Sequence, residues 1–237
     1  MKSAMTSIIM AIKGEVVTTD TILSGINAIY DARVPNSWMF SAGGDEISWI
    51  SPGLGLWYAG LIGRDQQFRT WVDNSKRPSS FWLTGFSNPQ GFLTGVQQEV
   101  TRLHKGDKWS LESVTVHTEV TEYDKAEQVV RPPKEGCYIH GLSLEGAAWS
   151  KKEISLSEST PKILFTTLPV LFVTAVTEKQ KRSMEGDYGP NGGFECAVYK
   201  YPKRTDRFYI FTVMLATREK APRHWIMRGV ALLCSTD

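Results

Sequence analysis

The sequence predicts an α+β fold in which an N-terminal helical subdomain is followed by a small incomplete antiparallel β-barrel. Apolar residues recur with helical spacing over roughly the first hundred residues. From about residue 109 onward, apolar and polar residues alternate instead, and prolines and glycines divide this half into short segments. We therefore expect a helical subdomain at 1–108 and a β-barrel subdomain at 109–237.

Two helices are predicted before Pro35. The apolar run 8–12 is interpreted as the buried face of a helix, because it is far shorter than the ~18 apolar residues that a membrane span needs. It starts with almost no leader, which suggests a fragment of a much longer chain. A second helix follows Thr18, Thr19 and Asp20, which are good capping residues. One face of this helix carries Ile22, Ile26, Ile29 and Tyr30.

Two more helices are predicted before residue 109. The first has a stripe made of Trp57, Leu61, Arg64, Phe68 and Trp71. The second begins at Pro89, because proline suits the first turn of a helix. Its basic C-terminal residues His104 and Lys105 complement the helix dipole, and Gly106 can end it.

The second half of the sequence is expected to form short strands. The segment 114–120 alternates valine with polar residues, which is typical of a half-buried strand. The other predicted strands are 137–140, 163–166, 170–176, 196–201, 208–215 and 225–233. The polar, glycine-rich segment 178–194 is interpreted as a mobile surface loop.

Composition and charge narrow the class of protein. The sequence is 41% hydrophobic and 22% charged, which is typical of a folded soluble protein. Its net charge of +2 is too small to indicate nucleic acid or an acidic membrane as a partner. The three cysteines Cys137, Cys196 and Cys234 form no CxxC pair, so we expect buried free thiols in a reducing, cytosolic compartment.

No motif in the sequence predicts catalysis. The phosphate-binding patterns GxxxxGK[ST] and GxGxxG are both absent, so no cofactor site is expected. The four histidines lack the spacing of zinc ligands, so no metal site is expected. Glu145, Glu153 and Glu158 could in principle act as acid–base groups, but solvated loop carboxylates are far commoner.

One aromatic and basic run, 198–209, stands out as a candidate interaction surface. Aromatic rings with basic neighbours could stack on the bases of a single-stranded nucleic acid. A strand–turn–strand hairpin with a basic tip is the favoured interpretation, because 202–206 has the chemistry of a turn. The candidate contact residues are Tyr199, Lys200, Tyr201, Lys203, Arg204 and Arg207.

Four ordered blocks of sequence resemble the C-terminal domain of dynein heavy chains. They are 77–94, then 136–142 with 145–149, then 158–162 before 168–170, and finally 224–234. Within that family, 64–68 and 98–102 are most similar to axonemal, outer-arm chains. The sequence departs from the pattern at Ser87, where an aromatic residue is common, and in the length of 178–194, while 1–34 matches only loosely.

The resemblance implies several helices followed by a small incomplete β-barrel, and no catalytic residue of its own. It implies a regulatory domain on the face of an ATPase ring opposite the mechanical linker, bridging the last ring module towards the first. The parent chain would be an ATP-driven, minus-end-directed microtubule motor that binds ATP and Mg²⁺ elsewhere. Its expected location is the cytoplasm and cytoskeleton, in the axoneme of a cilium or flagellum. Microtubules and other dynein-arm subunits would be indirect partners.

Two other classes of protein remain open from the residues alone. A free-standing β-barrel module would bind a peptide or an oligonucleotide without any motor present. A thiol enzyme would contain one cysteine that reacts unusually fast near neutral pH.

Overall fold

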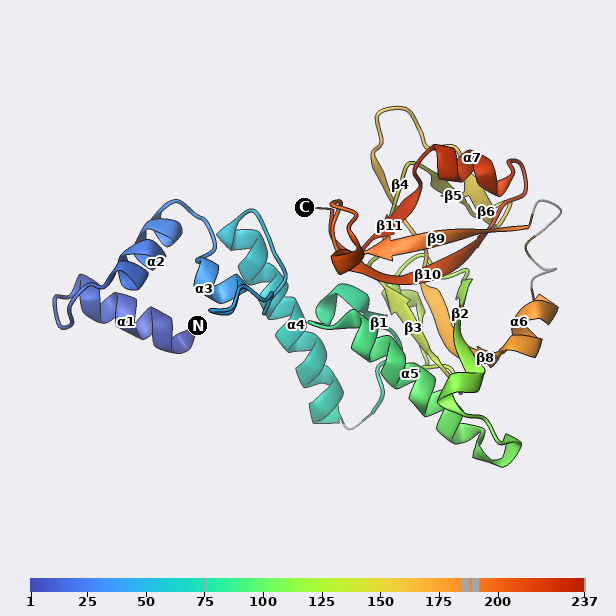
Figure 1. Ribbon diagram of the computed structural model, residues 1–237, viewed down its shortest axis with the longest axis horizontal. Helices are drawn as coiled ribbons and strands as arrows, with labels where there is room; N and C mark the ends of the chain where they lie inside the picture. Colours follow the sequence, from blue (N-terminus) through green and yellow to red (C-terminus); the bar gives the residue numbers. More distant parts are fainter. Residues whose placement is uncertain (75, 185–187, 189–191, 237) are drawn as a thin grey trace. The chain divides into compact units, whose positions relative to one another are not determined.

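The computed structural model describes residues 1–74, 76–184, 188 and 192–236, and it confirms an α+β fold (Figure 1). The helices are α1 (Lys2–Ile12), α2 (Asp20–Tyr30), α3 (Asn36–Met39), α4 (Leu54–Asn74), α5 (Pro89–Leu103), α6 (Glu178–Met184) and α7 (Pro222–Met227). The strands are β1 (Phe81–Trp82), β2 (Val114–Val120), β3 (Cys137–His140), β4 (Ser143–Glu145), β5 (Ala148–Ser150), β6 (Ser155–Ser157), β7 (Phe165–Thr167), β8 (Leu171–Thr177), β9 (Gly193–Tyr199), β10 (Tyr209–Ala216) and β11 (Ala231–Leu233).

The described residues pack as two compact units, 1–68 and 69–236. The change from helix to strand near 108/109 lies inside the second unit, between the end of α5 and the start of β2. As a boundary between subdomains, that position stays a prediction.

The first unit consists of helices around a small apolar core. The Thr19 hydroxyl caps α2 by accepting a hydrogen bond from the Ile22 amide, as the sequence predicts. α1 packs closely on α2, since a Cβ at Gly25 would lie 3.2 Å from Cδ1 of Ile8. Apart from this contact between α1 and α2, the buried side chains of Val34, Met39 and Trp57 form a hydrophobic cluster.

α1 forms as predicted, but it does not bury the run 8–12. Ile8 is buried, whereas Ile9 is 48% exposed and Ile12 is 70% exposed. The expectation that these isoleucines share one buried face is therefore wrong within the unit described, because α2 covers only one side of α1.

The second unit contains three sheets. Their strand orders are β1-β3-β8-β2, β10-β9-β11-β4-β7 and β5-β6. Most neighbouring strands are antiparallel, as predicted, but β1 pairs with β3 and β11 pairs with β9 in parallel. The two larger sheets are therefore mixed.

The four-stranded sheet packs against α5 (Figure 1). The side chains of Leu93, Val96 and Val100 are buried on this helix. Pro89 occupies the first turn, as predicted, and Asn88 caps the helix by accepting a hydrogen bond from the Gly91 amide at 3.0 Å. The helix ends at Leu103 with His104 as its C-cap residue, before the predicted Gly106.

The sheets do not close into a barrel. β2 and β10, which are edge strands of the two larger sheets, lie side by side without forming a ladder. Among the described residues, one hydrogen bond joins these two strands, from the Met214 amide to the Thr118 hydroxyl at 3.4 Å. We call this junction between β2 and β10 the seam.

Two expectations about the C-terminal half are wrong. The segment 225–233 is not one strand, because Pro222 starts α7, which continues to Met227 and buries Trp225 to 1% exposure. The segment 178–194 is not one loop, because it begins with α6 and ends in β9. Residues 185–187 and 189–191 of that segment lie outside the described residues.

Candidate functional site

The run 198–209 forms the predicted hairpin. β9 and β10 are antiparallel, with Tyr199 opposite Tyr209 at the end of the ladder. The Lys200 amide continues the pairing by donating to the Phe208 carbonyl at 2.8 Å. The residues between them form the tip, so the candidate contact residues do come from one local structure.

Two of the candidate contact residues, Tyr201 and Arg204, have side chains that hold the tip in place. Tyr201 is 6% exposed, and its ring lies edge-on to the ring of Phe208, with 5.0 Å between the centroids. Arg204 donates a hydrogen bond to the Gly229 carbonyl and forms an ion pair with Glu145, with 2.5 Å between Nη2 and Oε2. These contacts fasten the tip to β4 and to the turn before β11.

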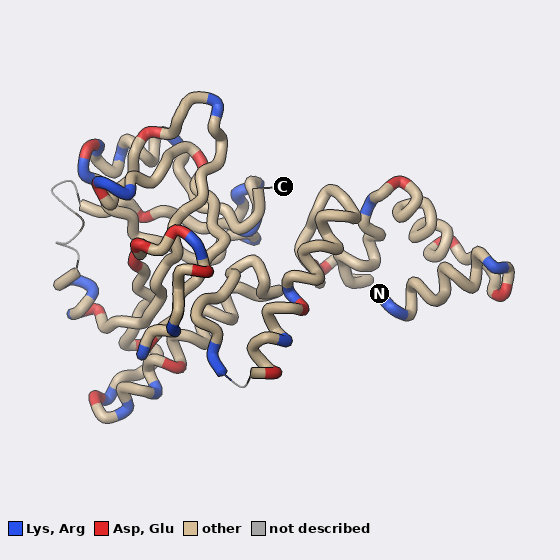
Figure 2. Tube along the Cα trace, turned by 180° about the vertical axis from the view of Figure 1, so that it is seen from behind, with Lys and Arg blue, Asp and Glu red and all other residues tan. Residues whose placement is uncertain are grey.

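The exposed charged residues of the tip are mainly basic, with Asp206 as the acidic one among them. Lys203 and Arg207 are exposed, and the Arg207 guanidinium lies 6.0 Å from the centroid of the Phe208 ring. At the base of the hairpin, the centroids of the Tyr199 and Tyr209 rings are 6.0 Å apart. Figure 2 shows basic and acidic positions intermixed along the trace. The positive charge of Lys203 and Arg207 is therefore confined to the hairpin tip and does not belong to a larger basic surface.

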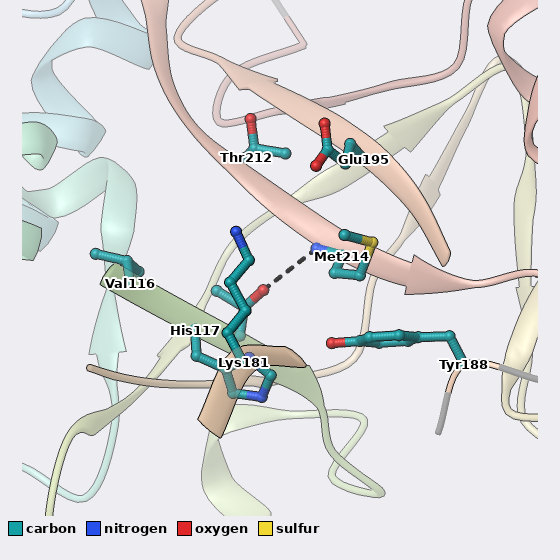
Figure 3. A pocket seen from close by; sticks show the side chains of 8 residues that line it. Val116, His117, Lys181, Tyr188, Glu195, Thr212 and Met214 are labelled. Atoms are coloured by element: carbon teal, nitrogen blue, oxygen red, sulfur yellow. Dashed lines mark hydrogen bonds between the residues drawn. The ribbon is translucent and has the colours of Figure 1, made fainter. Parts of the chain in front are cut away.

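A small pocket lies at the seam between the two larger sheets (Figure 3). Its volume is about 160 Å³, and its lining comes from β2, β9, β10, α6 and Tyr188. The Lys181 side chain extends into it towards the side on which Thr212 and Glu195 lie. Its floor includes the buried side chains of His117 and Thr118.

The pocket brings together groups that no pattern in the sequence connects. Lys181 and Glu195 both fall in or beside the segment interpreted as a loop, and His117 lies on a different strand. The cavity has room for a few water molecules or one small polar group. The His117 ring is already engaged, because Nε2 lies 3.1 Å from a carboxylate oxygen of Glu119.

The three cysteines are buried thiols. Burial raises the pKa of Cys137, Cys196 and Cys234 to about 12 each. A nucleophilic cysteine needs a lowered pKa and access to solvent. This environment disfavours the thiol-enzyme interpretation.

The carboxylates considered for acid–base work include two that contact basic side chains. Glu145 pairs with Arg204, and Glu158 lies 2.7 Å from His224 Nε2 and 2.8 Å from Arg228 Nη1.

In the ranges that the structure describes, no three His, Cys, Asp or Glu side chains are arranged to hold a metal ion. Within the same ranges, no helix combines the length and apolar character needed to cross a membrane.

In its architecture, the protein is an α+β domain with a fastened basic hairpin and a seam between two sheets. The family model for the C-terminal domain of dynein heavy chains matches residues 1–234. The sequence is 43% identical over 234 residues to dynein axonemal heavy chain 8 of Mus musculus. It is also 35% identical over 237 residues to the dynein gamma chain, flagellar outer arm, of Chlamydomonas reinhardtii. The protein therefore belongs to the family of C-terminal domains of dynein heavy chains.

The similarity spans this sequence but only a small part of its relatives. Each alignment covers 99% of this sequence and 5% of the relative. Dynein axonemal heavy chain 5 of Mus musculus, at 40% identity, shows the same proportions. Family membership and the axonemal type of these relatives thus agree with the resemblance found in the sequence.

Proposed function

We propose that this domain is a non-catalytic regulatory part of an axonemal dynein heavy chain, in the outer-arm class. The relatives named axonemal or flagellar outer-arm support the class and a location in the axoneme of a cilium or flagellum. The parent chain would be an ATP-driven, minus-end-directed microtubule motor. This domain would rest on the ATPase ring, on the face opposite the linker, and contact the first and last ring modules. ATP and Mg²⁺ would bind elsewhere in the parent chain.

The observation that carries this proposal is an uncovered apolar stripe on α1. Met5, Ile9 and Ile12 follow one another at helical spacing and are 37%, 48% and 70% exposed. Exposed apolar stripes of this kind mark surfaces that another protein segment covers. Since this sequence spans 5% of its relatives' length, the rest of a heavy chain offers such a cover.

The hairpin tip is the second proposed contact. Lys203 and Arg207 present positive charge outward, while Arg204 and Tyr201 hold the tip in place. A rigid basic tip suits an acidic patch on a ring module, because a preformed contact loses little conformational entropy on binding. The apolar and basic contacts lie on different elements and can engage different modules.

Regulation would follow from differential contact. A ring that changes conformation during its ATPase cycle would make different contacts with the domain in each state. Only such a difference in contact free energy shifts the populations of the states. We therefore expect the domain to bias the cycle without supplying a catalytic group.

The test uses a complete heavy-chain motor that carries this domain. One variant removes the domain, one carries Ile9→Gln with Ile12→Gln, and one carries Lys203→Glu with Arg207→Glu. The matched control is Val17→Gln, because Val17 is 85% exposed in the same unit but lies outside α1. We expect ATPase rate, force or run length to change in the first three motors and to stay unchanged in the control.

Two outcomes would count against the proposal. Unchanged motility after deletion would remove the regulatory role while leaving the family assignment intact. Saturable binding of the 237-residue protein to a peptide or oligonucleotide with no ring present, measured by calorimetry, would favour the free-standing binding module instead.

A further inference from the structure

A histidine at the end of α5 lies between two carboxylates from different segments. His104 Nδ1 is 3.0 Å from Oδ2 of Asp107, in the turn that follows the helix. His104 Nε2 is 2.9 Å from Oε2 of Glu135, in the segment that leads into β3. The ring also stacks on Trp109, with 4.1 Å between centroids and 16° between planes.

The two contacts together require a protonated ring. A neutral imidazole carries one N–H, so it can donate to one carboxylate while its other nitrogen presents a lone pair. An imidazolium donates from both nitrogens, and stacking on an indole face also favours the cation. The pKa of His104 is raised above its ordinary value of 6.5, first by the hydrogen bond to Glu135 and then by the one to Asp107.

Two carboxylates dominate the electrostatic surroundings of the His104 ring. Glu135 and Asp107 are the charged groups that act on the pKa of His104, and both raise it. Burial opposes them, but the side chain keeps 26% exposure. Lys105 and Lys108 of the same turn are exposed to solvent.

Glu135 belongs to the segment 130–135, which makes few other contacts with the rest of the fold. Val129 is buried at its start, and Gly136 is fixed at its end by close approach to the Val173 carbonyl. Within the described ranges, residues 130–135 form no backbone hydrogen bond with another backbone group. Within the same ranges, the one polar contact of residues 130–135 is the hydrogen bond between Glu135 and His104.

We propose that His104 is a pH-sensitive latch that fastens the segment 130–135 to the end of α5. The latch is closed while the imidazole is protonated. It weakens as pH rises through the midpoint of His104, because one of the two hydrogen bonds is then lost and a lone pair faces a carboxylate. The shape of this surface segment therefore depends on pH, through the protonation state of His104.

The test is an NMR titration of the 237-residue protein between roughly pH 5.5 and 9. The His104 ring shifts give its midpoint, and the amide order parameters of Lys134 and Glu135 report the latch. We expect a midpoint above 6.5. Across it, we expect the order parameters to fall from about 0.85 towards about 0.6.

Two variants separate the latch from a general effect of pH. Glu135→Gln should lower the His104 midpoint and remove the pH response of the segment, because the neutral amide can accept from the protonated ring and donate to the neutral ring alike. His224→Gln is the matched control, because His224 pairs with Glu158 on another element and should not alter the His104 midpoint. A midpoint at or below 6.5, order parameters that do not follow the ring titration, or a pH response that survives in Glu135→Gln would each overturn the proposal.

Discussion

At the scale of single residues, Gly136 is a position that cannot readily accept a side chain. Its φ is +69°, and a Cβ there would lie 2.2 Å from the Val173 carbonyl oxygen and 2.8 Å from Cβ of Thr174. The backbone of β8 cannot move away without breaking its pairing with β2 and β3. We expect Gly136→Ala to lower the free energy of unfolding by at least about 2 kcal/mol, measured by chemical denaturation.

A second glycine supplies the control for this prediction. Gly95 lies on the exposed side of α5, and a Cβ there would meet nothing within 4 Å. Gly95→Ala should therefore stabilise the protein by about 0.5–1 kcal/mol through better helix propensity. Equal effects at the two positions would show that the close approach at Gly136 is not rigid.

The buried thiols give another residue-scale prediction. A pKa of about 12, against an ordinary 9.0, reduces the thiolate fraction at pH 8 by about a thousandfold. We expect alkylation of the native protein by iodoacetamide to be much slower than that of the unfolded protein, as followed by mass spectrometry. One cysteine that reacts quickly in the native protein would revive the thiol-enzyme interpretation.

At the scale of elements, α5 depends on its N-terminal cap. Asn88 accepts the hydrogen bond from the Gly91 amide, which no carbonyl of the helix could satisfy. Asn88→Ala should cost about 1 kcal/mol in the free energy of unfolding, measured by chemical denaturation, whereas Asn88→Asp should retain the cap. A loss in Asn88→Asp as large as that in Asn88→Ala would mean that the cap contributes little.

The sequence predicts some elements better than others, and the reason is physical. β2 and β3 appear where expected, because alternation of apolar and polar residues is a local consequence of one buried face. The prediction for 225–233 failed, because Trp225 and its apolar neighbours suit a helix and a strand equally, and Pro222 decides for the helix. β5 and β6 have three residues each, too few for any period to show.

At the scale of the whole molecule, local patterns predict the hairpin but not what holds it. The turn chemistry of 202–206 is visible in the sequence, and the ladder from β9 to β10 confirms it. Nothing local indicates that Arg204 reaches Glu145, since 59 residues separate the two. The same holds for the seam pocket, whose Lys181, Glu195 and His117 meet only after the sheets have formed. Candidate surfaces predicted from sequence therefore contain residues that the fold itself uses.

The ion pair between Arg204 and Glu145 offers the final test of that argument. The two side chains are 29% and 23% exposed, so a partly shielded pair should show a coupling of about 1 kcal/mol in a double-mutant cycle of Arg204→Met and Glu145→Gln. Arg204→Met should cost more than Glu145→Gln, because it also removes the hydrogen bond to the Gly229 carbonyl. Added salt should weaken the coupling.

The neighbouring Arg207 provides the control for the double-mutant cycle of Arg204 and Glu145. Arg207→Met should change the free energy of unfolding by less than about 0.5 kcal/mol, because this exposed side chain has no ionic role in holding the tip within the described structure. A coupling of zero between Arg204 and Glu145, with a large loss at Arg207, would reverse the assignment. Arg204 would then belong to the proposed contact with the ring and Arg207 to the fold, so the cycle decides which basic residues of this hairpin remain available to a partner.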